Sequence, residues 1–403
     1  MKFLRRAVPA QWCRFQRRGY VDPSVIKHVR DRGFDHAVER ERYLKPVLAI
    51  KHLLKSEPSM SLPISAIANE KEALHIPIRP IEFIRKYPTV FEEHLPGGGG
   101  VLPHIKLASQ AVEIDSDEQL VYQSESYKQD MADRLIKLLM ISRVHKLPLH
   151  VLTAIQWEMG LPHDYSTNLV SEFPDYFWVI EEESFSSSLE LVCWSHRHSI
   201  SFIEKLSKDA IPGAFPMDFH PNFVMDKRFK VWLEDWQKLN FISPYSNALH
   251  LGPNTDESDK WVVGILHELL NLFVSKKVEK ETLLDLTDCF GIRSRAKRAL
   301  MQHPGIFYVS SKAATHTVFL KEAYTRGALV EKNPLMEIRH RYLRLMNNRS
   351  GENRKKSEVK AAEVIREKDN SDKVYRNGEE DDDDEDDEDD EDEDDEDEDD
   401  EDE

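Results

Sequence analysis

Apolar side chains recur every three or four residues in two neighbouring stretches, Trp261–Ser275 and Glu281–Cys289, and this spacing predicts two amphipathic helices. After a glycine-containing turn, a third helix is expected over Arg293–Gln302. Two β-prone runs follow, Phe307–Ser311 and Thr315–Glu322, separated by a short polar loop. Three helices followed by a two-stranded hairpin form a winged-helix arrangement, with the hairpin as wing and the third helix as recognition helix.

A short phrase occurs three times, as FIRKYPTVFEE (Phe83–Glu93), LVSEFPDYFWVIE (Leu169–Glu181) and ALMQHPGIFYVSS (Ala299–Ser311). Each copy places an aromatic residue or histidine before proline, then two residues, then phenylalanine. The residue before proline is disfavoured in helices, so each phrase predicts a helix end followed by an extended segment. Similar helical and β-prone stretches flank all three copies, and the strands expected around the first are Val90–His94 and Ile105–Val112. We therefore expect three tandem winged-helix-like units, at residues 35–115, 126–198 and 259–326.

The remaining segments complete a mainly α-helical chain with small β-hairpins, of the α+β class. Residues 199–258 are expected to form a helical connector whose aromatic side chains pack units two and three together, and residues 327–346 to form a basic helix. Residues 347–378, nearly free of large apolar groups, are a predicted linker. A purely helical repeat array is the competing architecture, and the β-branched residues after Pro304 favour the hairpins.

Charge is distributed very unevenly along the chain of 403 residues, whose formal net charge is −19. The 25 residues from Glu379 to Glu403 are all acidic, so the rest of the chain keeps 55 basic against 49 acidic residues. Self-repulsion predicts that this tail is disordered. The nearly neutral body excludes a generally basic nucleic-acid coat, so phosphate contacts require local clusters of Lys and Arg. Three distant cysteines exclude a disulfide scaffold and a cysteine-based zinc site, and fit a reducing compartment.

The first 20 residues resemble a targeting presequence, because they contain six basic residues and no acidic one, with arginines interleaved among apolar side chains. The absence of Ser and Thr favours a mitochondrion, with the chloroplast as alternative. A merely basic N-terminal arm is the other reading. No segment approaches the roughly 18 uninterrupted apolar residues that a membrane span needs, so no membrane is expected as a partner.

Motifs for catalysis are weak. The four glycines at 97–100 lack the Lys-Ser or Lys-Thr of a phosphate-binding loop. His267 and Glu268 are followed by Asn271 where a zinc protease needs a second histidine, so we expect this pair to be only the more polar edge of an apolar helix. Cys193, His196 and His198 have no partner pair at matching spacing and are expected at a strand end facing solvent. We expect no enzyme activity, metal, cofactor or small-molecule substrate.

The positive signal for function is a local excess of base, twelve basic against three acidic residues from Phe290 to Arg349. On the predicted helix Arg293–Gln302, the apolar residues fall on one side, and Arg293, Lys297, Arg298 and Gln302 on the other. The predicted RNA-binding residues are Arg293, Arg295, Lys297, Arg298, Lys312, Lys321, Arg326, Arg339, Arg341 and Arg344, with His340 and Tyr342 available for stacking. The simpler alternative is a solvated helix face.

These phrases, together with WLEDWQKLNFISPYSNA (Trp232–Ala248) and the block Leu283–Leu335, resemble the plant organelle RNA recognition (PORR) domain family. The resemblance covers roughly Asp35 to Arg344. It implies import into mitochondria or chloroplasts and binding of organellar group II intron RNA, with other splicing factors as further partners. The protein would promote splicing without catalysing it. The alternative is a nuclear DNA- or chromatin-binding winged-helix protein whose acidic tail contacts histones.

We predict that residues 1–25, fused to a fluorescent reporter, direct it to mitochondria, since an acid-free, arginine-rich segment is drawn in by the membrane potential. Microscopy of the fusion beside a mitochondrial dye tests this. A diffuse cytosolic, nuclear or plastid signal would contradict the prediction.

Overall fold

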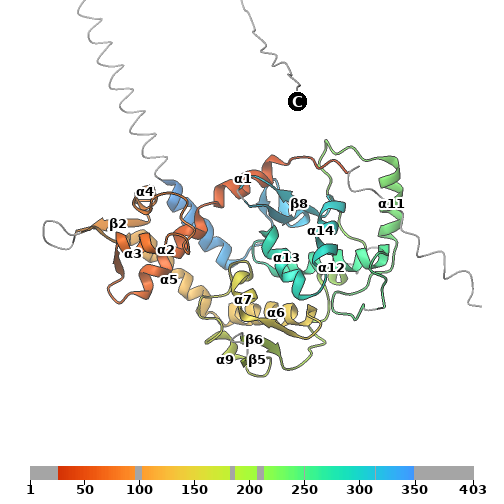
Figure 1. Ribbon diagram of the computed structural model, residues 1–403, viewed down its shortest axis with the longest axis horizontal. Helices are drawn as coiled ribbons and strands as arrows, with labels where there is room; N and C mark the ends of the chain where they lie inside the picture. The colour runs from red at the N-terminus through yellow and green to blue at the C-terminus, as the bar shows by residue number, and fades with distance from the viewer. Residues whose placement is uncertain are drawn as a thin grey trace, which may run out of the picture. The chain divides into compact units, whose positions relative to one another are not determined.

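Each of three helical segments in the chain ends in a small antiparallel sheet (Figure 1). The computed structural model describes residues 26–95, 102–181, 187–206, 213–248, 250–313 and 315–348. The chain divides after Asn348 into two units, and all described residues lie before that division. The predicted presequence, acidic tail and nearly all of the predicted linker lie outside the described residues. Small antiparallel sheets among many helices confirm the α+β class.

The three segments share one order of elements: a helix, a short strand, further helices and two strands. The first segment contains α2 (Leu44–Ser56), β1 (Ser61–Pro63), α3 (Ile64–Asn69), α4 (Pro80–Arg85), β2 (Phe91–His94) and β3 (His104–Leu107). The second contains α6 (Glu125–Ile141), β4 (Lys146–Pro148), α7 (Leu149–Ala154), α8 (Gln156–Met159), α9 (Leu169–Glu172), β5 (Phe177–Glu181) and β6 (Ser187–Leu191). The third contains α12 (Asp256–Leu272), β7 (Lys277–Glu279), α13 (Lys280–Cys289), α14 (Arg293–Gln302), β8 (Phe307–Ser310) and β9 (Thr317–Leu320).

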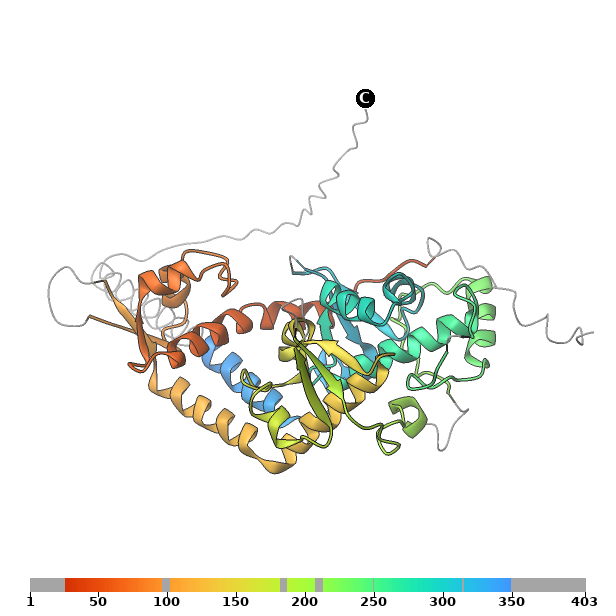
Figure 2. The same ribbon diagram turned by 60° about the horizontal axis from the view of Figure 1, so that its bottom comes forward.

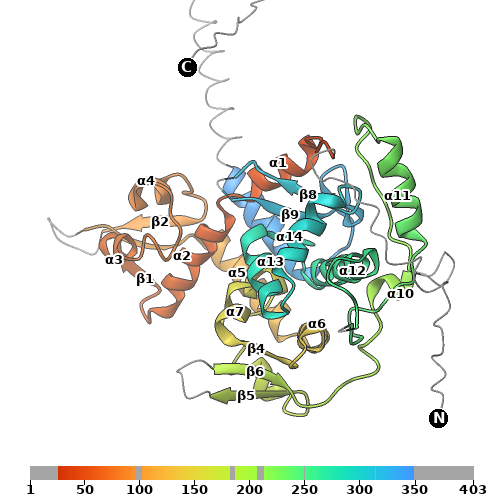
Figure 3. The same cartoon turned by 45° about the vertical axis from the view of Figure 1, so that its right-hand side comes forward.

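The sheet that ends each segment has three strands, whereas the sequence predicted two. The last strand of each segment lies between the other two, as Figure 3 shows for β6 between β4 and β5. The missed strand is the short one after the first helix, and its middle residue pairs with an apolar residue of the central strand. These pairs are Leu62 with Ile105, Leu147 with Leu189, and Val278 with Val318. A three-residue strand is too short to show an alternating pattern in the sequence.

A left-handed residue precedes each short strand. Met60, His145 and Lys276 have φ of 52°, 53° and 51°. Their backbone N–H groups donate to the carbonyls of Glu57, Ser142 and Phe273, closing the turn that reverses the chain from helix to strand. None of the three is glycine, so tertiary contacts must hold a conformation that side chains disfavour.

A second correction concerns residues 105–112, which were predicted as one strand. The strand β3 ends at Leu107, and Ser109 begins α5 (Ser109–Gln123), which meets α6 at an angle (Figure 2). The backbone N–H of Val112 bonds to the carbonyl of Ala108, so the apolar run switches from strand to helix within two residues. Short apolar runs cannot distinguish these two states.

The second and third segments share one hydrophobic core with the residues between them. These residues form α10 (Phe202–Leu206) and α11 (Lys227–Gln237), and Trp236 of α11 is 1% exposed in that core. The rings of Trp236 and His303 lie 4.4 Å apart between centroids, which joins α11 to the end of α14. The aromatic residues at 199–258 therefore pack between two segments.

The first segment has a separate core that the C-terminal end of the described chain completes. A helix at 334–348 places Tyr342 and Leu343 in this core beside α2 (Figure 2). Tyr342 is 1% exposed and lies under the ammonium of Lys51, so the prediction that it is available for stacking is wrong. This segment contains many charged residues, and for that reason its apolar face was not recognised in the sequence.

Helix α1 (Arg32–Glu41) packs on the sheet of the third segment, although it precedes the first in sequence. The ring of Phe34 stacks on that of Tyr308 at 4.9 Å. The carboxylate of Asp35 accepts hydrogen bonds from Tyr308 at 2.9 Å and Ser310 at 2.6 Å. Thus α1, at the N-terminal end of the described chain, packs on the third segment, and the helix 334–348, at the C-terminal end, packs on the first.

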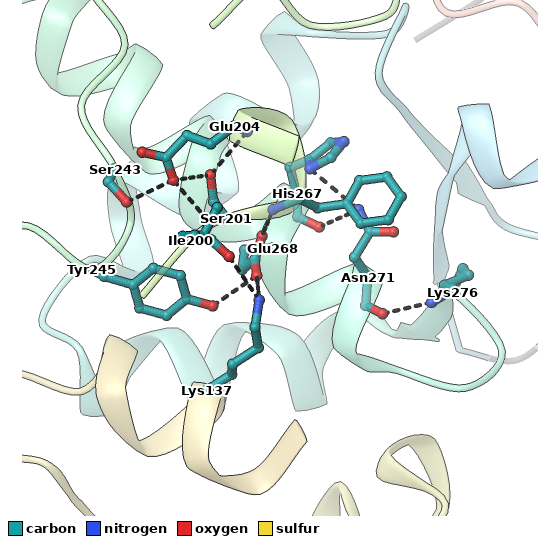
Figure 4. Close-up of polar contacts among 11 residues, drawn as sticks. Lys137, Ile200, Ser201, Glu204, Ser243, Tyr245, His267, Glu268, Asn271 and Lys276 are labelled. Carbon is teal, nitrogen blue, oxygen red and sulfur yellow. Dashed lines mark hydrogen bonds and ion pairs between the residues drawn. The ribbon is translucent and has the colours of Figure 1, made fainter. Parts of the chain in front are cut away.

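Buried polar contacts join α6, the connector and α12 (Figure 4). Glu268, 1% exposed, accepts hydrogen bonds from the ammonium of Lys137 and the hydroxyl of Tyr245, both at 2.7 Å. The backbone N–H of Phe202 donates to its other oxygen at 2.6 Å. The neighbouring His267, also 1% exposed, bonds to Glu322 at 2.6 Å. The expectation that this pair forms the more polar edge of the helix is wrong, because both residues are buried by other segments.

Glu268→Gln is expected to lower the free energy of unfolding by about 3–5 kcal/mol, since it removes the carboxylate that pairs with the ammonium of Lys137, whose side chain is only 13% exposed. Urea unfolding followed by circular dichroism measures this. The matched control is Glu82→Gln, because Glu82 and Arg79 lie 3.8 Å apart with side chains 57% and 83% exposed, and an exposed pair contributes about 0–1 kcal/mol. Equal destabilisation of both variants would contradict the prediction.

Candidate nucleic-acid interface

Helix α14 spans the predicted residues Arg293–Gln302, and its apolar face is as expected. The residues predicted to face the core are 1% exposed or less; these are Ile292, Ala296, Ala299 and Leu300. Lys297 on the other side is exposed. Gln302, predicted on the polar side, is only 7% exposed, so that assignment is wrong. The connector covers the C-terminal end of α14, which the sequence of the helix alone does not show.

Arg293 is already bound by carboxylates of the preceding helix. Its guanidinium pairs with Asp285 and, at 3.3 Å, with Glu281, both on α13. The hydrogen bond to Asp285 raises the pKa of Arg293 above its usual value. A phosphate would have to compete with these two acids, so Arg293 is a weaker candidate for RNA binding than its exposure suggests.

Arg295 lies near two other arginines, Arg298 of the same helix and Arg143, which is distant in the sequence. Its guanidinium donates to the Ser258 hydroxyl at 3.0 Å and lies 5.7 Å from the centroid of the Trp261 ring. Burial lowers the pKa of Arg295, and the nearby charges of Arg143 and Arg298 lower it further. We call Arg143, Arg295 and Arg298 the arginine cluster. Several positive charges near one another raise the local positive potential, and a positive potential attracts phosphate.

Arg143 is the member of the cluster that the sequence analysis missed. It lies in the turn between α6 and β4, in a different segment from α14. Its side chain is exposed, and among the described residues no carboxylate lies within ion-pair distance of it. No signal near Arg143 in the sequence indicates this position, because only the packing of α6 against α12 carries it to Arg295.

The predicted residues beyond α14 occupy different environments. Lys312 is exposed and pairs with Glu39 of α1 at 3.0 Å. Lys321 is 4% exposed, its ammonium donates to the backbone carbonyl of Asp218, and burial lowers its pKa. Arg326 is exposed at φ 52° in the turn between β10 (Tyr324–Thr325) and β11 (Ala328–Leu329). Lys321 therefore binds a backbone carbonyl of the connector, whereas Arg326 is exposed to solvent.

The three arginines of the helix 334–348 also differ from one another. Arg339 is 4% exposed, its guanidinium lies 3.5 Å from the centroid of the Trp157 ring, and it donates to the Trp157 carbonyl at 2.7 Å. Arg341 pairs with Asp117 at 2.5 Å. Arg344 is exposed. Arg339 thus fastens this helix to the second segment, and Arg344 has the most accessible charge of the three.

The residues weighed as possible metal ligands have structural partners. The imidazole of His198 bonds to the Ser195 hydroxyl at 2.6 Å and lies 3.1 Å from the carboxylate of Asp133. His198 is 7% exposed, so it does not face solvent as expected, whereas Cys193 is exposed. In the described part of the chain, no group of three or more His, Cys, Asp or Glu residues is placed to hold a metal ion. No described helix is long and apolar enough to cross a membrane.

Comparison with known proteins identifies the family. Residues 29–351 match the Plant organelle RNA recognition domain. The chain belongs to the plant organelle RNA recognition family. The match includes all three segments and the helix 334–348, and it confirms the resemblance found in the sequence.

Two of the three relatives compared below are named for an organelle. WHAT'S THIS FACTOR 9, mitochondrial, of Arabidopsis thaliana is 34% identical over 83% of the chain and 87% of its own length. ROOT PRIMORDIUM DEFECTIVE 1 of the same plant is 29% identical over 90% of both chains. The chloroplastic WHAT'S THIS FACTOR 1 homolog of Arabidopsis thaliana is 28% identical over 85% of the chain and 67% of its own length. The expected mitochondrial location, with the chloroplast as alternative, is confirmed by these relatives. No solved structure matches the chain.

We predict that Arg143→Ala combined with Lys297→Ala weakens RNA binding and flattens its dependence on salt, by about 0.7 log units per log unit of salt for each phosphate that is no longer neutralised. Both side chains are exposed, so the fold should survive. Fluorescence anisotropy with a labelled single-stranded RNA at several salt concentrations measures the slope.

The matched control for this pair is Lys227→Ala combined with Lys238→Ala, which removes two exposed charges from the two ends of α11. A slope that falls equally in both double variants would show a general charge effect and would remove Arg143 and Lys297 from the interface.

Proposed function

We propose that the protein binds RNA inside a plant mitochondrion through the third segment and the arginine cluster. The observation that carries the proposal is the family match over residues 29–351, joined to a concentration of arginines at one place on that matched region. Affinity would come from phosphate contacts with basic side chains, chiefly Arg143, Lys297 and Arg298.

The three segments are proposed to be winged-helix modules with different tasks. Their order of helices and strands and the central last strand of each sheet support this reading. In the third, α14 carries four basic residues, whereas α9 of the second is preceded by Asn168 and ends at Glu172. The third segment would contact RNA, and the second would serve structure or a protein partner.

We further propose that the bound RNA is a group II intron, the class that the family resemblance implies, and that the protein promotes splicing by holding the intron in its active shape. The RNA itself would perform the transesterifications, and other splicing factors would act on the same transcript. The packing of the two chain ends supports such a role. Helix α1 packs on the third segment and the helix 334–348 on the first, so both ends join segments that are distant in the sequence. The nuclear alternative has no support from the two relatives whose names give a location, one mitochondrial and one chloroplastic.

Sequencing the RNA that co-purifies with the tagged, crosslinked protein from isolated mitochondria tests the proposal. We expect enrichment of one or a few group II introns, and accumulation of the same unspliced transcripts in plants that lack the protein. The double variant Arg143→Ala, Lys297→Ala should recover less of this RNA than the control Lys227→Ala, Lys238→Ala. Recovery of RNA without introns, with normal splicing in the mutant plant, would refute the splicing role.

A further inference from the structure

A cavity of about 260 Å³ lies where the end of α6, residues 244–248 and the first half of α12 meet. Helices α6 and α12 contact each other in this region (Figure 3). The side chains that matter for its chemistry are Arg143, His145, Trp194, Tyr245 and Trp261. No Asp or Glu is among the described residues that line it. The cavity therefore combines an aromatic lining with a positive edge.

Two aromatic rings of the lining contact each other edge to face, and one of them is partly exposed. The rings of His145 and Trp194 lie 5.3 Å apart at 60°, and Trp194 is 38% exposed. Trp261 is also in contact with charge, because the guanidinium of Arg295 lies 5.7 Å from its ring centroid. An exposed tryptophan at the edge of an aromatic cavity offers a stacking surface that the fold itself does not use.

Two polar atoms of the lining lack partners. Trp261 is 7% exposed, and among the described residues no acceptor lies within hydrogen-bond distance of its Nε1. Nδ1 of His145 is likewise buried without a partner there. The hydroxyl of Tyr245, by contrast, is already bound to Glu268. Buried donors are nearly always satisfied in folded proteins, so the indole N–H of Trp261 requires an acceptor, either a water molecule or a ligand in the cavity.

The volume of the cavity and the charge beside it restrict the kind of ligand that it can bind. A cavity of about 150 Å³ binds benzene in another protein, so 260 Å³ accommodates one heterocyclic base. A nucleobase offers a flat face for stacking and ring or carbonyl acceptors for an indole N–H. The exposed Arg143 on the cavity lining, with the rest of the arginine cluster close by, suits the phosphate attached to such a base.

We propose that this cavity binds one unstacked nucleobase of single-stranded RNA, with Trp194 and His145 stacking on it, Trp261 Nε1 donating to it, and Arg143 contacting the adjacent phosphate. The inference rests on the proposed RNA binding and adds a base-binding site to it. Specificity for unpaired RNA follows, since a base inside a duplex cannot enter.

The test compares two labelled strands of about 16 nucleotides, a single-stranded RNA of mixed sequence and a fully abasic strand of the same charge. The full-length protein should bind the RNA more tightly than the abasic strand. Trp194→Ala should reduce that preference by about 5- to 100-fold, the range for stacking one base on an aromatic side chain, and leave the salt dependence unchanged. His145→Asn should also reduce it, and asparagine tolerates the φ of 53° at this position.

Trp178→Ala is the matched control, because Trp178 is a 64% exposed tryptophan on β5 that does not line the cavity. It should keep the full preference for RNA over the abasic strand. An unchanged preference in both Trp194→Ala and His145→Asn, with melting temperatures like that of the parent protein, would overturn the base-binding site while leaving RNA binding intact. Failure of the unmodified protein to bind the RNA at low salt would overturn the proposed function and this inference together.

Discussion

Helix α12 is buried around almost its whole circumference, and the rest of the structure depends on how its polar side chains are satisfied. The helix contacts α6 of the second segment, α10 and α11 of the connector, and α14 and β9 of its own segment. Four of its ionisable residues are at most 5% exposed; they are Asp259, Lys260, His267 and Glu268. A buried charge without a partner destabilises a protein by several kcal/mol, so each neighbour must present the matching group.

Those partners fix where the connector lies. Asp259 accepts from Trp236 Nε1 at 3.1 Å and from His303 at 2.7 Å. Burial opposes its charge, but His303 holds the pKa of Asp259 below its usual range. Lys260 donates to the carbonyls of Gln237 and Leu239 at the end of α11, and burial lowers the pKa of Lys260 to about 8. These contacts hold the connector against α12, and its residues 244–248 line the cavity.

Local sequence patterns were sufficient where neighbours in the chain decide the structure. The bounds of α14 and its apolar face follow from helical spacing and from the proline at 304. The same reasoning failed where distant segments decide. Lys321 and Arg339 look like phosphate ligands by charge alone, yet Asp218 and Trp157, more than 100 residues away, bury them. Arg143 was missed for the converse reason, because its basic neighbours in space come from α14.

The left-handed turns at Met60, His145 and Lys276 have the same backbone structure but different surroundings. All three reverse the chain into an edge strand, and their geometry is nearly identical. In the second segment the turn also lies beside residues 244–248, and its side chains line the cavity there. Arg143 and His145 occupy one turn and differ in chemistry, one suited to phosphate and one to a ring. Phosphate contacts strengthen binding to any RNA, whereas a base site distinguishes unpaired from paired RNA. The packing of the second segment on the third thus creates a surface that neither could form alone, which gives a physical reason for these two repeats to pack around one shared helix.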